Sequence, residues 1–448
     1  MINNSIKANF EFINHASYFL NYKKLKILVD PWFSGSAFDN GWSLLINYLP
    51  DKSKILKTTH IWYSHEHPDH FSISDLKYIY KINPGIIILF QNTKDKRLIN
   101  YCKKIGFKVK ELNNFEKIKL ENFFEIQIIK CGALDSMSIM YFENKAVINL
   151  NDCVPNEDLF KLKDLIQIGE RQKILLTQFS YAQKSGNPDE PEIREKAVIR
   201  KLEQIKQQVI FFKPDFIIPF ASYIFFSNKD NFYLNDRIAK IEKIEKYIND
   251  NFKNTKPIIL YPGEEWDFSI KENTISINKY IEARKNIKVL FRDKLVPIED
   301  IIKETVTYRK KIFFKNNRYL IFFIKFLSNL FRKDLFPEVI FFVEDLNKSI
   351  KFSLTTDIKV IDGKSLNIDV QLNSHSFFYL LKHEWGASTL MINGKFIDCS
   401  KNGEFKIKRL FSLSQINSTG KNLLSFIIDR IFFKKHYKID DNEASFIK

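Results

Sequence analysis

Short apolar runs alternate with longer amphipathic runs over the first part of the chain. The apolar runs, rich in Ile, Phe and Val, have the length and composition of buried strands. They are FEFIN, LKILVD, HIWYS, GIIILF, EIQIIK, AVINLN, KILLTQ, DFIIPF and PIILYP. Helical periodicity is found in SISDLKYIYKI, EPEIREKAVIRKLEQIKQQVIFF and LNDRIAKIEKIEKYINDNF. This alternation predicts an α/β domain with buried sheets, which we assign to residues 1–285.

The pattern changes in the rest of the chain. Residues 286–339 are rich in Phe and Lys and predict a helical connector. Within residues 340–448, FFVED, IKFSLTT, IKVIDG and SLNIDVQL predict hairpin-like strands. A helix in SHSFFYLLKHEWG and a last strand in TLMINGKF, with a tight turn at Asn393-Gly394, are expected to follow. We therefore expect a second, smaller C-terminal α+β domain.

The most apolar stretch is RYLIFFIKFLSNLF (318–331), which Lys325 interrupts. It is shorter than the roughly 20 residues of a membrane span, so no transmembrane segment is expected. Two interpretations remain open. The stretch can form a buried or amphipathic helix that packs within the protein. It can also form a helix on a membrane surface or on a partner, with Phe on one side and Lys and Arg at its flanks.

Composition and charge restrict the function only moderately. The chain has 70 Lys and Arg residues against 53 Asp and Glu residues, a net charge of +17. Lys is spread along the chain without a polybasic tail, so we expect solvated faces, a small anionic substrate and no nucleic acid. Four widely spaced cysteines without a C-x-x-C pair indicate a reducing compartment. The N-terminus has no signal-peptide pattern, so we expect a cytoplasmic protein.

The stretch SHEHPDHF (64–71) contains three of the eight histidines of the chain. His65, His67, Asp69 and His70 fall between a predicted strand and a predicted helix. A loop at a strand end can direct several side chains to one point on a rigid frame. Imidazole and carboxylate groups are ligands of zinc, iron and manganese. The spacing therefore predicts a metal site.

H-x-H-x-D-H resembles the signature of the metallo-β-lactamase superfamily. INHASYFLNYKKLKILVDPWFSG (13–35) and AVINLNDC (146–153) resemble two further segments of that superfamily. LLTQFSYA, DFIIPFASY and YPGEEW are similar to segments of the branch that contains the sugar-phosphate lactonases and the hydrolase-like part of CMP-N-acetylneuraminate hydroxylase. The resemblance covers roughly residues 8–270 and implies an αββα sandwich.

The resemblance also implies roles for individual residues. His65 and His67 would bind a first metal ion, and Asp69 and His70 would bind a second and belong to the catalytic centre. Asp152 would lie between the two ions. Two cations that share a carboxylate generate a hydroxide nucleophile, and iron in the same pocket could activate oxygen.

Two more residues are expected near the metal. Asp30, at the end of LKILVD, resembles the aspartate that orients a ligand histidine in the superfamily. Its other interpretation is a turn residue before Pro31. His15, from the predicted opening hairpin, could lie near the site or be an ordinary hydrogen-bonded strand residue.

The pattern departs from the superfamily at two ligands. The superfamily normally supplies two further histidines, but no histidine occurs between His70 and His375. The candidate substitutes are Asp135 and Cys131 for the first, and Asn228 and Asp230 for the second. With Asp135 as a ligand the set is rich in carboxylates, which favours iron or manganese over zinc and allows one or two divalent ions.

These features predict a metal-dependent hydrolase or oxygenase that acts on an anionic sugar or nucleotide-sugar derivative. The chain lacks the paired C-x-H and C-x-x-H spacing of an iron–sulfur module, so an oxygenase would need a redox partner. A catalytically silent binding or scaffold protein on the same fold remains an alternative. A metal-dependent nuclease is a weaker one, because no basic patch is visible in the sequence.

Overall fold

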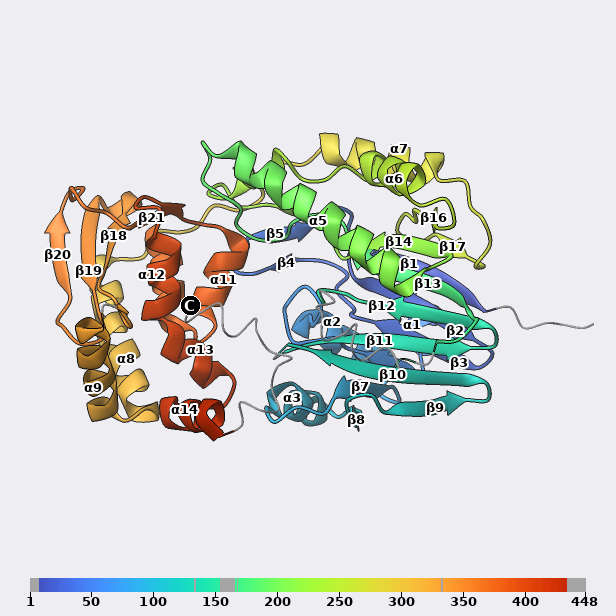
Figure 1. Ribbon diagram of the computed structural model, residues 1–448, viewed down its shortest axis with the longest axis horizontal. Coiled ribbons are helices and arrows are strands. Elements are labelled where there is room, and N and C mark those ends of the chain that lie inside the picture. The colour runs from blue at the N-terminus through green and yellow to red at the C-terminus, as the bar shows by residue number, and fades with distance from the viewer. Residues whose placement is uncertain (1–7, 133, 154–165, 167, 332, 433–448) are drawn as a thin grey trace, which may run out of the picture.

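The computed structural model describes residues 8–132, 134–153, 166, 168–331 and 333–432. The chain forms a large unit built on two sheets and a smaller unit at one end of it (Figure 1). The first large sheet has seven strands. In spatial order they are β17 (Glu265–Trp266), β1 (Asn9–Asn14), β2 (Ser17–Tyr22), β3 (Leu25–Val29), β6 (His60–Trp62), β7 (Ile87–Gln91) and β8 (Lys108–Leu112). From β3 to β8 neighbouring strands are parallel, and from β17 to β3 they are antiparallel.

The second large sheet also has seven strands. In spatial order they are β16 (Lys256–Pro257), β14 (Phe216–Phe220), β13 (Gln172–Gln178), β12 (Lys145–Asn149), β11 (Asp135–Phe142), β10 (Phe124–Cys131) and β9 (Lys117–Glu121). Strands β16 to β12 are parallel and β12 to β9 antiparallel. A small third sheet consists of β15 (Ile224–Phe226), β5 (Trp42–Leu44) and β4 (Ser36–Ala37).

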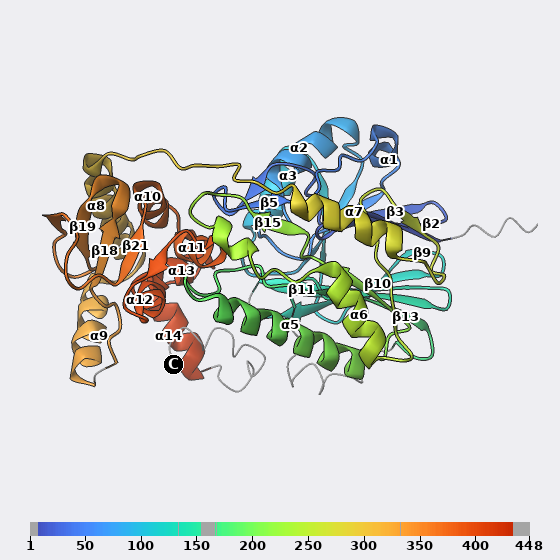
Figure 2. The same ribbon diagram turned by 90° about the horizontal axis from the view of Figure 1, so that it is seen from above.

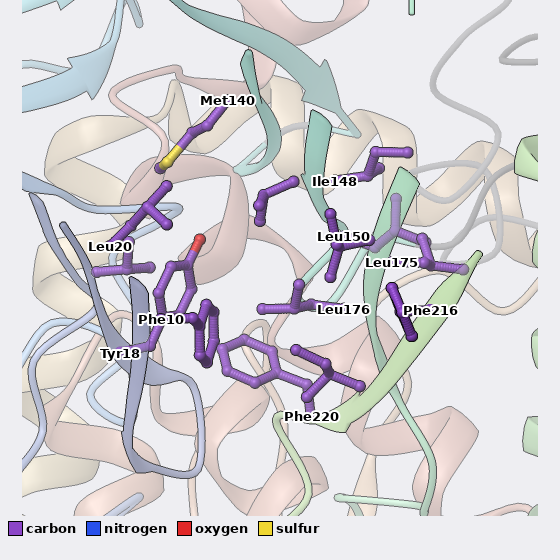
Figure 3. Close-up of a cluster of buried hydrophobic side chains, with 14 of the residues drawn as sticks. Phe10, Tyr18, Leu20, Met140, Ile148, Leu150, Leu175, Leu176, Phe216 and Phe220 are labelled. Atoms are coloured by element: carbon purple, nitrogen blue, oxygen red, sulfur yellow. The ribbon is translucent and has the colours of Figure 1, made fainter. Parts of the chain in front are cut away.

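The two large sheets pack face to face, because alternate residues of each strand point to opposite faces. In β2, Tyr18 and Leu20 belong to the core between the sheets, whereas Phe19 packs with the helices outside. Figure 3 shows side chains of β1 and β2 facing Ile148, Leu176 and others from the second sheet. The large unit is therefore a layered sandwich with helices on both outer faces.

Two groups of helices cover the sandwich (Figure 2). On one side lie α1 (Lys52–Leu56), α2 (Ile73–Ile82) and α3 (Arg97–Ile105), and on the other lie α5 (Pro191–Phe212), α6 (Ile241–Asn251) and α7 (Thr274–Lys285). The predicted αββα sandwich is confirmed. In the part of the chain that the structure describes, no helix combines the length and apolarity that crossing a membrane requires.

Phe220 provides a test of the core between the sheets. Its ring is fully buried and meets the rings of Phe12 and Tyr18 at centroid distances of 6.3 and 5.7 Å. Phe220→Ala should lower the free energy of unfolding by about 3–5 kcal/mol, because it removes apolar contacts and leaves a cavity. Phe123→Ala, at a 76% exposed position, should cost less than about 0.5 kcal/mol. Urea unfolding followed by circular dichroism measures both, and equal losses would contradict this packing.

The smaller unit is a five-stranded sheet with helices around it. In spatial order the strands are β20 (Lys359–Asp362), β19 (Lys348–Phe352), β18 (Val339–Val343), β21 (Val370–Leu372) and β22 (Ile397–Asp398). The helices are α8 (Ile298–Lys315), α9 (Arg318–Leu330), α10 (Ser374–Lys382), α11 (Gly386–Asn393), α12 (Gly403–Leu410), α13 (Ser412–Ser418) and α14 (Leu423–Phe432). The expected small C-terminal α+β domain is therefore present. Side chains of α8 and α9, such as Ile312 and Ile321, share its core, while the boundaries at 285 and 339 stay predictions.

Three local predictions were wrong. The run TLMINGKF contains a helix, α11, rather than a strand, because a short apolar run is compatible with both and tertiary packing decides. Gly394, at a φ of 69°, is the left-handed residue that ends α11. The run PIILYP contributes only its first residue to β16. Helix α6 begins at Ile241, not in the preceding LNDRIAK, part of which forms a 3₁₀ turn (Phe232–Asn235).

Candidate metal centre

The motif loop lies at the carboxyl end of β6, in the middle of the first sheet. It begins after Trp62 and ends where Ser72 caps α2 by accepting a hydrogen bond from the backbone of Asp75. Within it, the backbone N–H groups of His70 and Phe71 both donate to the carbonyl of His67, at 3.0 and 2.7 Å. This turn folds the loop back on itself and brings its imidazole and carboxylate groups together.

The first half of the centre contains His65 and His67. Nε2 of His65 lies 2.9 Å from Nδ1 of His67. Two carboxylates approach the same nitrogen from the second sheet, with Oδ1 of Asp135 at 3.8 Å and Oδ2 of Asp152 at 3.6 Å. Asp135 is the first residue of β11, and Asp152 follows the carboxyl end of β12. The two sheets therefore deliver donors to one point.

The second half contains Asp69 and His70. Nε2 of His70 lies 3.3 Å from Oδ2 of Asp69 and 3.5 Å from Oδ1 of Asp152. His15 joins this half, with its Nε2 at 3.2 Å from Oδ2 of Asp69. One oxygen of Asp152 thus faces each half, which is the arrangement expected of a carboxylate that bridges two cations.

Asp30 fixes the orientation of His70 from behind. Oδ2 of Asp30 accepts a hydrogen bond from Nδ1 of His70 at 2.8 Å, from the Ser64 hydroxyl at 2.6 Å and from the Asn151 amide at 3.1 Å. Its Oδ1 accepts from the backbone of Ser64 at 2.8 Å. With a proton held on Nδ1, Nε2 is the ring nitrogen of His70 that faces the centre and would bind a cation in place of its own proton.

Asp30→Asn should weaken metal binding by about ten- to a hundredfold, because its amide can donate to Nδ1 and favour the wrong tautomer of His70. Competition with a chelator measures the affinity. An unchanged affinity in a folded variant would contradict this role of Asp30.

The charges around the centre favour a cation. Burial and the charge of His70 lower the pKa of His65 to about 4, so that His65 is neutral and able to act as a ligand. Burial disfavours a charge on His70, yet Asp69 and Asp152 outweigh it and hold the pKa of His70 well above its ordinary value. Burial raises the pKa of Asp135 to about 6. Among the residues that the structure describes, Nε2 of His70 and one oxygen each of Asp69 and Asp135 have no hydrogen-bond partner, and all three atoms are buried. These residues therefore fit one or two divalent ions.

The first domain has the metallo-β-lactamase fold. The deciding observation is the pair of facing sheets, with the H-x-H-x-D-H loop at the end of a strand in one sheet and Asp152 after a strand in the other. No family model matches the chain.

Curated relatives are similar to part of the chain. The "cytidine monophosphate-N-acetylneuraminic acid hydroxylase" of Cricetulus griseus is 24% identical over 280 residues, which cover 57% of this chain and 47% of that protein. The Danio rerio protein of the same name is 27% identical over 155 residues, or 32% and 26% of the two chains. The chain thus spans between about a quarter and about half of the length of these relatives. A Homo sapiens relative, 24% identical over 59% of this chain and 55% of its own length, is named inactive.

Two solved structures are similar to the chain at a lower sequence identity than the curated relatives. A possible metal-dependent hydrolase from Veillonella parvula has a TM-score of 0.44 and 18% identity, and covers 58% of this chain and 100% of its own. CmlA, a diiron β-hydroxylase from Streptomyces venezuelae, has a TM-score of 0.42 and 14% identity, and covers 58% and 54%.

The structure does not bring all the candidate ligands of the metallo-β-lactamase domain together. Cys131 pairs with Asp135 in the register of β10 and β11, and its thiol contacts the carbonyl of Ile129 at 3.7 Å. The side chains of Asn228 and Asp230 take part in a different network, at the contact with the second domain. Asn228 donates to Asp293 at 2.9 Å, and Asp230 accepts from Asn373.

Two residues missed by the sequence analysis hold the carboxylate of Asp152, the predicted bridging residue. The amide of Gln178 donates to Oδ1 of Asp152, and the ammonium of Lys201 donates to Gln178 at 2.7 Å. Burial lowers the pKa of Lys201 below its ordinary value, and the charge of Asp152 offsets only part of this effect. Gln178 lies in LLTQFSYA, so the resemblance could have indicated it. Lys201 comes from the charged helix α5 and has no distinguishing signal.

A loop of the metallo-β-lactamase domain connects the centre to the second domain. The ring of Phe38 meets that of His67 edge-on, at a centroid distance of 5.8 Å. Phe38, Asp39 and the next residue all have positive φ values, a conformation that non-glycine residues rarely adopt. Asn393 of the second domain donates to the carbonyl of Phe38 at 3.1 Å, and Lys395 donates to the carboxylate of Asp39 at 2.6 Å. The second domain therefore holds the loop that packs on a candidate ligand.

Proposed function

We propose that the protein is a metal-dependent enzyme, a hydrolase or an oxygenase, that acts on an anionic sugar derivative. The observation that carries this proposal is Asp152, whose two oxygens lie 3.5 and 3.6 Å from imidazole nitrogens of the two halves of the centre. A carboxylate with a purely structural role would not require two buried imidazoles beside it. It would also leave the unpartnered carboxylate oxygens of Asp69 and Asp135 unexplained.

The donors divide into two sets under this proposal. His65, His67 and Asp135 would hold one ion, Asp69 and His70 would hold the other, and Asp152 would serve both. His15 is within reach of the second set and is a candidate to supply the imidazole that the sequence pattern lacks. The three motif histidines, with or without His15, and the three carboxylates form a harder set than a histidine-only site, which favours iron or manganese. Such ions, when bound, activate water, and iron also supports oxygen chemistry.

The residues of the chain orient and enclose the reacting groups. Asp30 keeps the proton of His70 on Nδ1, which leaves Nε2 available within the centre. Gln178 and Lys201 fix the carboxylate of Asp152 at its outer side. His65, Asp69 and His70 are buried, so bulk water is excluded from these three side chains.

The curated relatives support an anionic sugar as the substrate class. Their name specifies a sugar acid linked to cytidine monophosphate, and the net charge of +17 on this chain suits a negatively charged substrate. An oxygenase reaction would draw its electrons from a separate redox protein. The free thiols of Cys102, Cys131, Cys153 and Cys399 support a reducing compartment such as the cytoplasm.

Activity assays on protein loaded anaerobically with iron or manganese test the proposal. We expect either conversion of CMP-N-acetylneuraminate in the presence of oxygen and a reductant, or hydrolysis of a phosphorylated sugar lactone without them. The matched variants are Asp152→Asn, which should be inactive, and His383→Ala in the second domain, which should be active. Stoichiometric metal without turnover of either substrate class would contradict the substrate proposal. Absence of metal would indicate a silent binding protein.

A further inference from the structure

Helix α9 presents an apolar stripe to solvent. The stripe consists of Tyr319, Phe322, Phe323, Phe326 and Leu330, whose spacings of three and four residues place them on one face of the helix. Their exposed fractions range from 38% to 84%. An amphipathic helix of a globular protein normally turns such a stripe toward the core, so this orientation requires an explanation.

The opposite side of α9 attaches it to the second domain. Ile321 is fully buried in the core of that domain. Ser328, which is polar, is buried on the same side of the helix. Phe314, at the end of α8 and 92% exposed, and Phe331, 67% exposed, extend the apolar surface beyond both ends of α9. The helix is therefore held firmly on one side, with its aromatic side uncovered in the part of the chain that the structure describes.

The segment that carries the stripe has charged side chains of one sign, and some of them pair with acidic residues outside it. Residues 305–333 include eight Lys and Arg residues and no Asp or Glu. Arg318 lies beside the stripe, with its guanidinium 5.6 Å from the centre of the Phe322 ring, and Lys325 lies on the same flank and pairs with Asp334 at 3.5 Å. A surface that is apolar in the middle and basic around it is complementary to a partner that is apolar inside and anionic outside.

We propose that α9 binds in the plane of an anionic lipid bilayer surface, with its aromatic stripe at the boundary between headgroups and acyl chains. Phenylalanine and leucine on one face with basic residues at the flanks are the composition of an interfacial helix. A second copy of the chain is a poorer occupant, because two such stretches would face each other with no acidic residue inside either to neutralise the repulsion.

The position of α9 agrees with this role. In both ribbon views it lies at the outer end of the second domain, on the side remote from the metallo-β-lactamase sandwich (Figures 1 and 2). Binding through this end would leave the first domain free of the membrane surface.

Co-sedimentation of the full chain with lipid vesicles tests the proposal. The probes are vesicles with about 30% phosphatidylglycerol in phosphatidylcholine, and pure phosphatidylcholine as the neutral arm. The variant is Phe322→Ser/Phe323→Ser/Phe326→Ser. The matched control is Ile270→Ser, which changes a 79% exposed residue of the first domain. Phe323, Phe326 and Ile270 are more than half exposed and Phe322 is 38% exposed, so the variants should stay folded, and their melting temperatures are compared with that of the parent.

We expect the wild type and the Ile270→Ser control to bind the anionic vesicles, and the triple variant to bind at least about tenfold more weakly, because three aromatic side chains no longer insert. Neutral vesicles should bind more weakly than anionic ones. Failure of the wild type to bind anionic vesicles, or equal binding by the triple variant, would overturn the proposal. A dimer that the triple variant dissociates, without vesicle binding, would identify a second copy as the occupant and also overturn it.

Discussion

Replacement of both His67 and His70 by alanine is expected to remove the bound metal from the purified protein. The two imidazoles belong to different halves of the centre, and each half has few other neutral nitrogen donors. Loss of both leaves three carboxylates close together, whose mutual repulsion in a buried site opposes their ionisation. We expect metal content to fall from at least one ion per chain to below about 0.2, measured by elemental analysis after anaerobic purification from supplemented medium.

His383→Ala is the matched control for this experiment. His383 is a partly buried histidine of the second domain, and its ring packs on Tyr379 and Trp385 rather than near the centre. This control should retain the parental metal content. Equal metal in the double variant and the parent would remove the proposed site.

Lys395→Met is expected to destabilise the contact between the two domains strongly. The Lys395 side chain is fully buried, and its ammonium lies 2.6 Å from Oδ2 of Asp39 and 2.8 Å from Oδ2 of Asp293. Removal of the ammonium leaves two buried carboxylates with only His375 and neutral amide donors to stabilise them, and breaking a buried pair in this way typically costs about 3–5 kcal/mol. Urea unfolding at neutral pH measures the loss. The variant should also show altered metal affinity, because Asp39 adjoins Phe38 and Phe38 packs on His67.

The decrease in the free energy of unfolding that Lys395→Met causes should become smaller at acidic pH. Burial raises the pKa of Asp293, but Lys395 outweighs burial and holds that pKa below its ordinary value. A lowered pKa contributes stability above the unfolded-state value and loses it as the pH falls through the folded-state value. The wild type therefore loses this contribution in acid, whereas the variant has none to lose. A pH-independent difference between the two proteins would contradict this explanation.

Two further variants separate the buried charge from the loss of side-chain volume. Asp39→Asn/Asp293→Asn/Lys395→Met removes all three charges and should recover part of the stability, and asparagine tolerates the positive φ of residue 39. Lys285→Met breaks an exposed pair with Glu282 and should cost less than about 1 kcal/mol.

The sequence was most informative where chemistry and local spacing coincide. His65, His67, Asp69 and His70 lie within residues 65–70. The structure places Asp152 and Asp30 beside them. The alternation of strands and helices predicted an α/β domain with buried sheets, and the resemblance to the superfamily added the αββα sandwich. Asp152 could be named only through the resemblance, because local spacing does not reveal which distant loop reaches a site.

Other features depend on long-range contacts that no local pattern encodes. Lys395 meets Asp39 across 356 positions of sequence, and nothing in either segment marks the pairing. Asn228 and Asp230 are plausible ligands by type, yet the fold directs them to the domain contact. Helix α11 was predicted as a strand because its apolar run is too short for periodicity to decide between the two.

Anomalous diffraction at the iron or manganese edge is the most direct test of the metal centre. Crystals of anaerobically purified protein should show an anomalous peak at about 2.0–2.3 Å from an oxygen of Asp152 and from Nε2 of His65 or His70. Protein that contains stoichiometric metal but shows its anomalous peak away from these side chains would contradict the account.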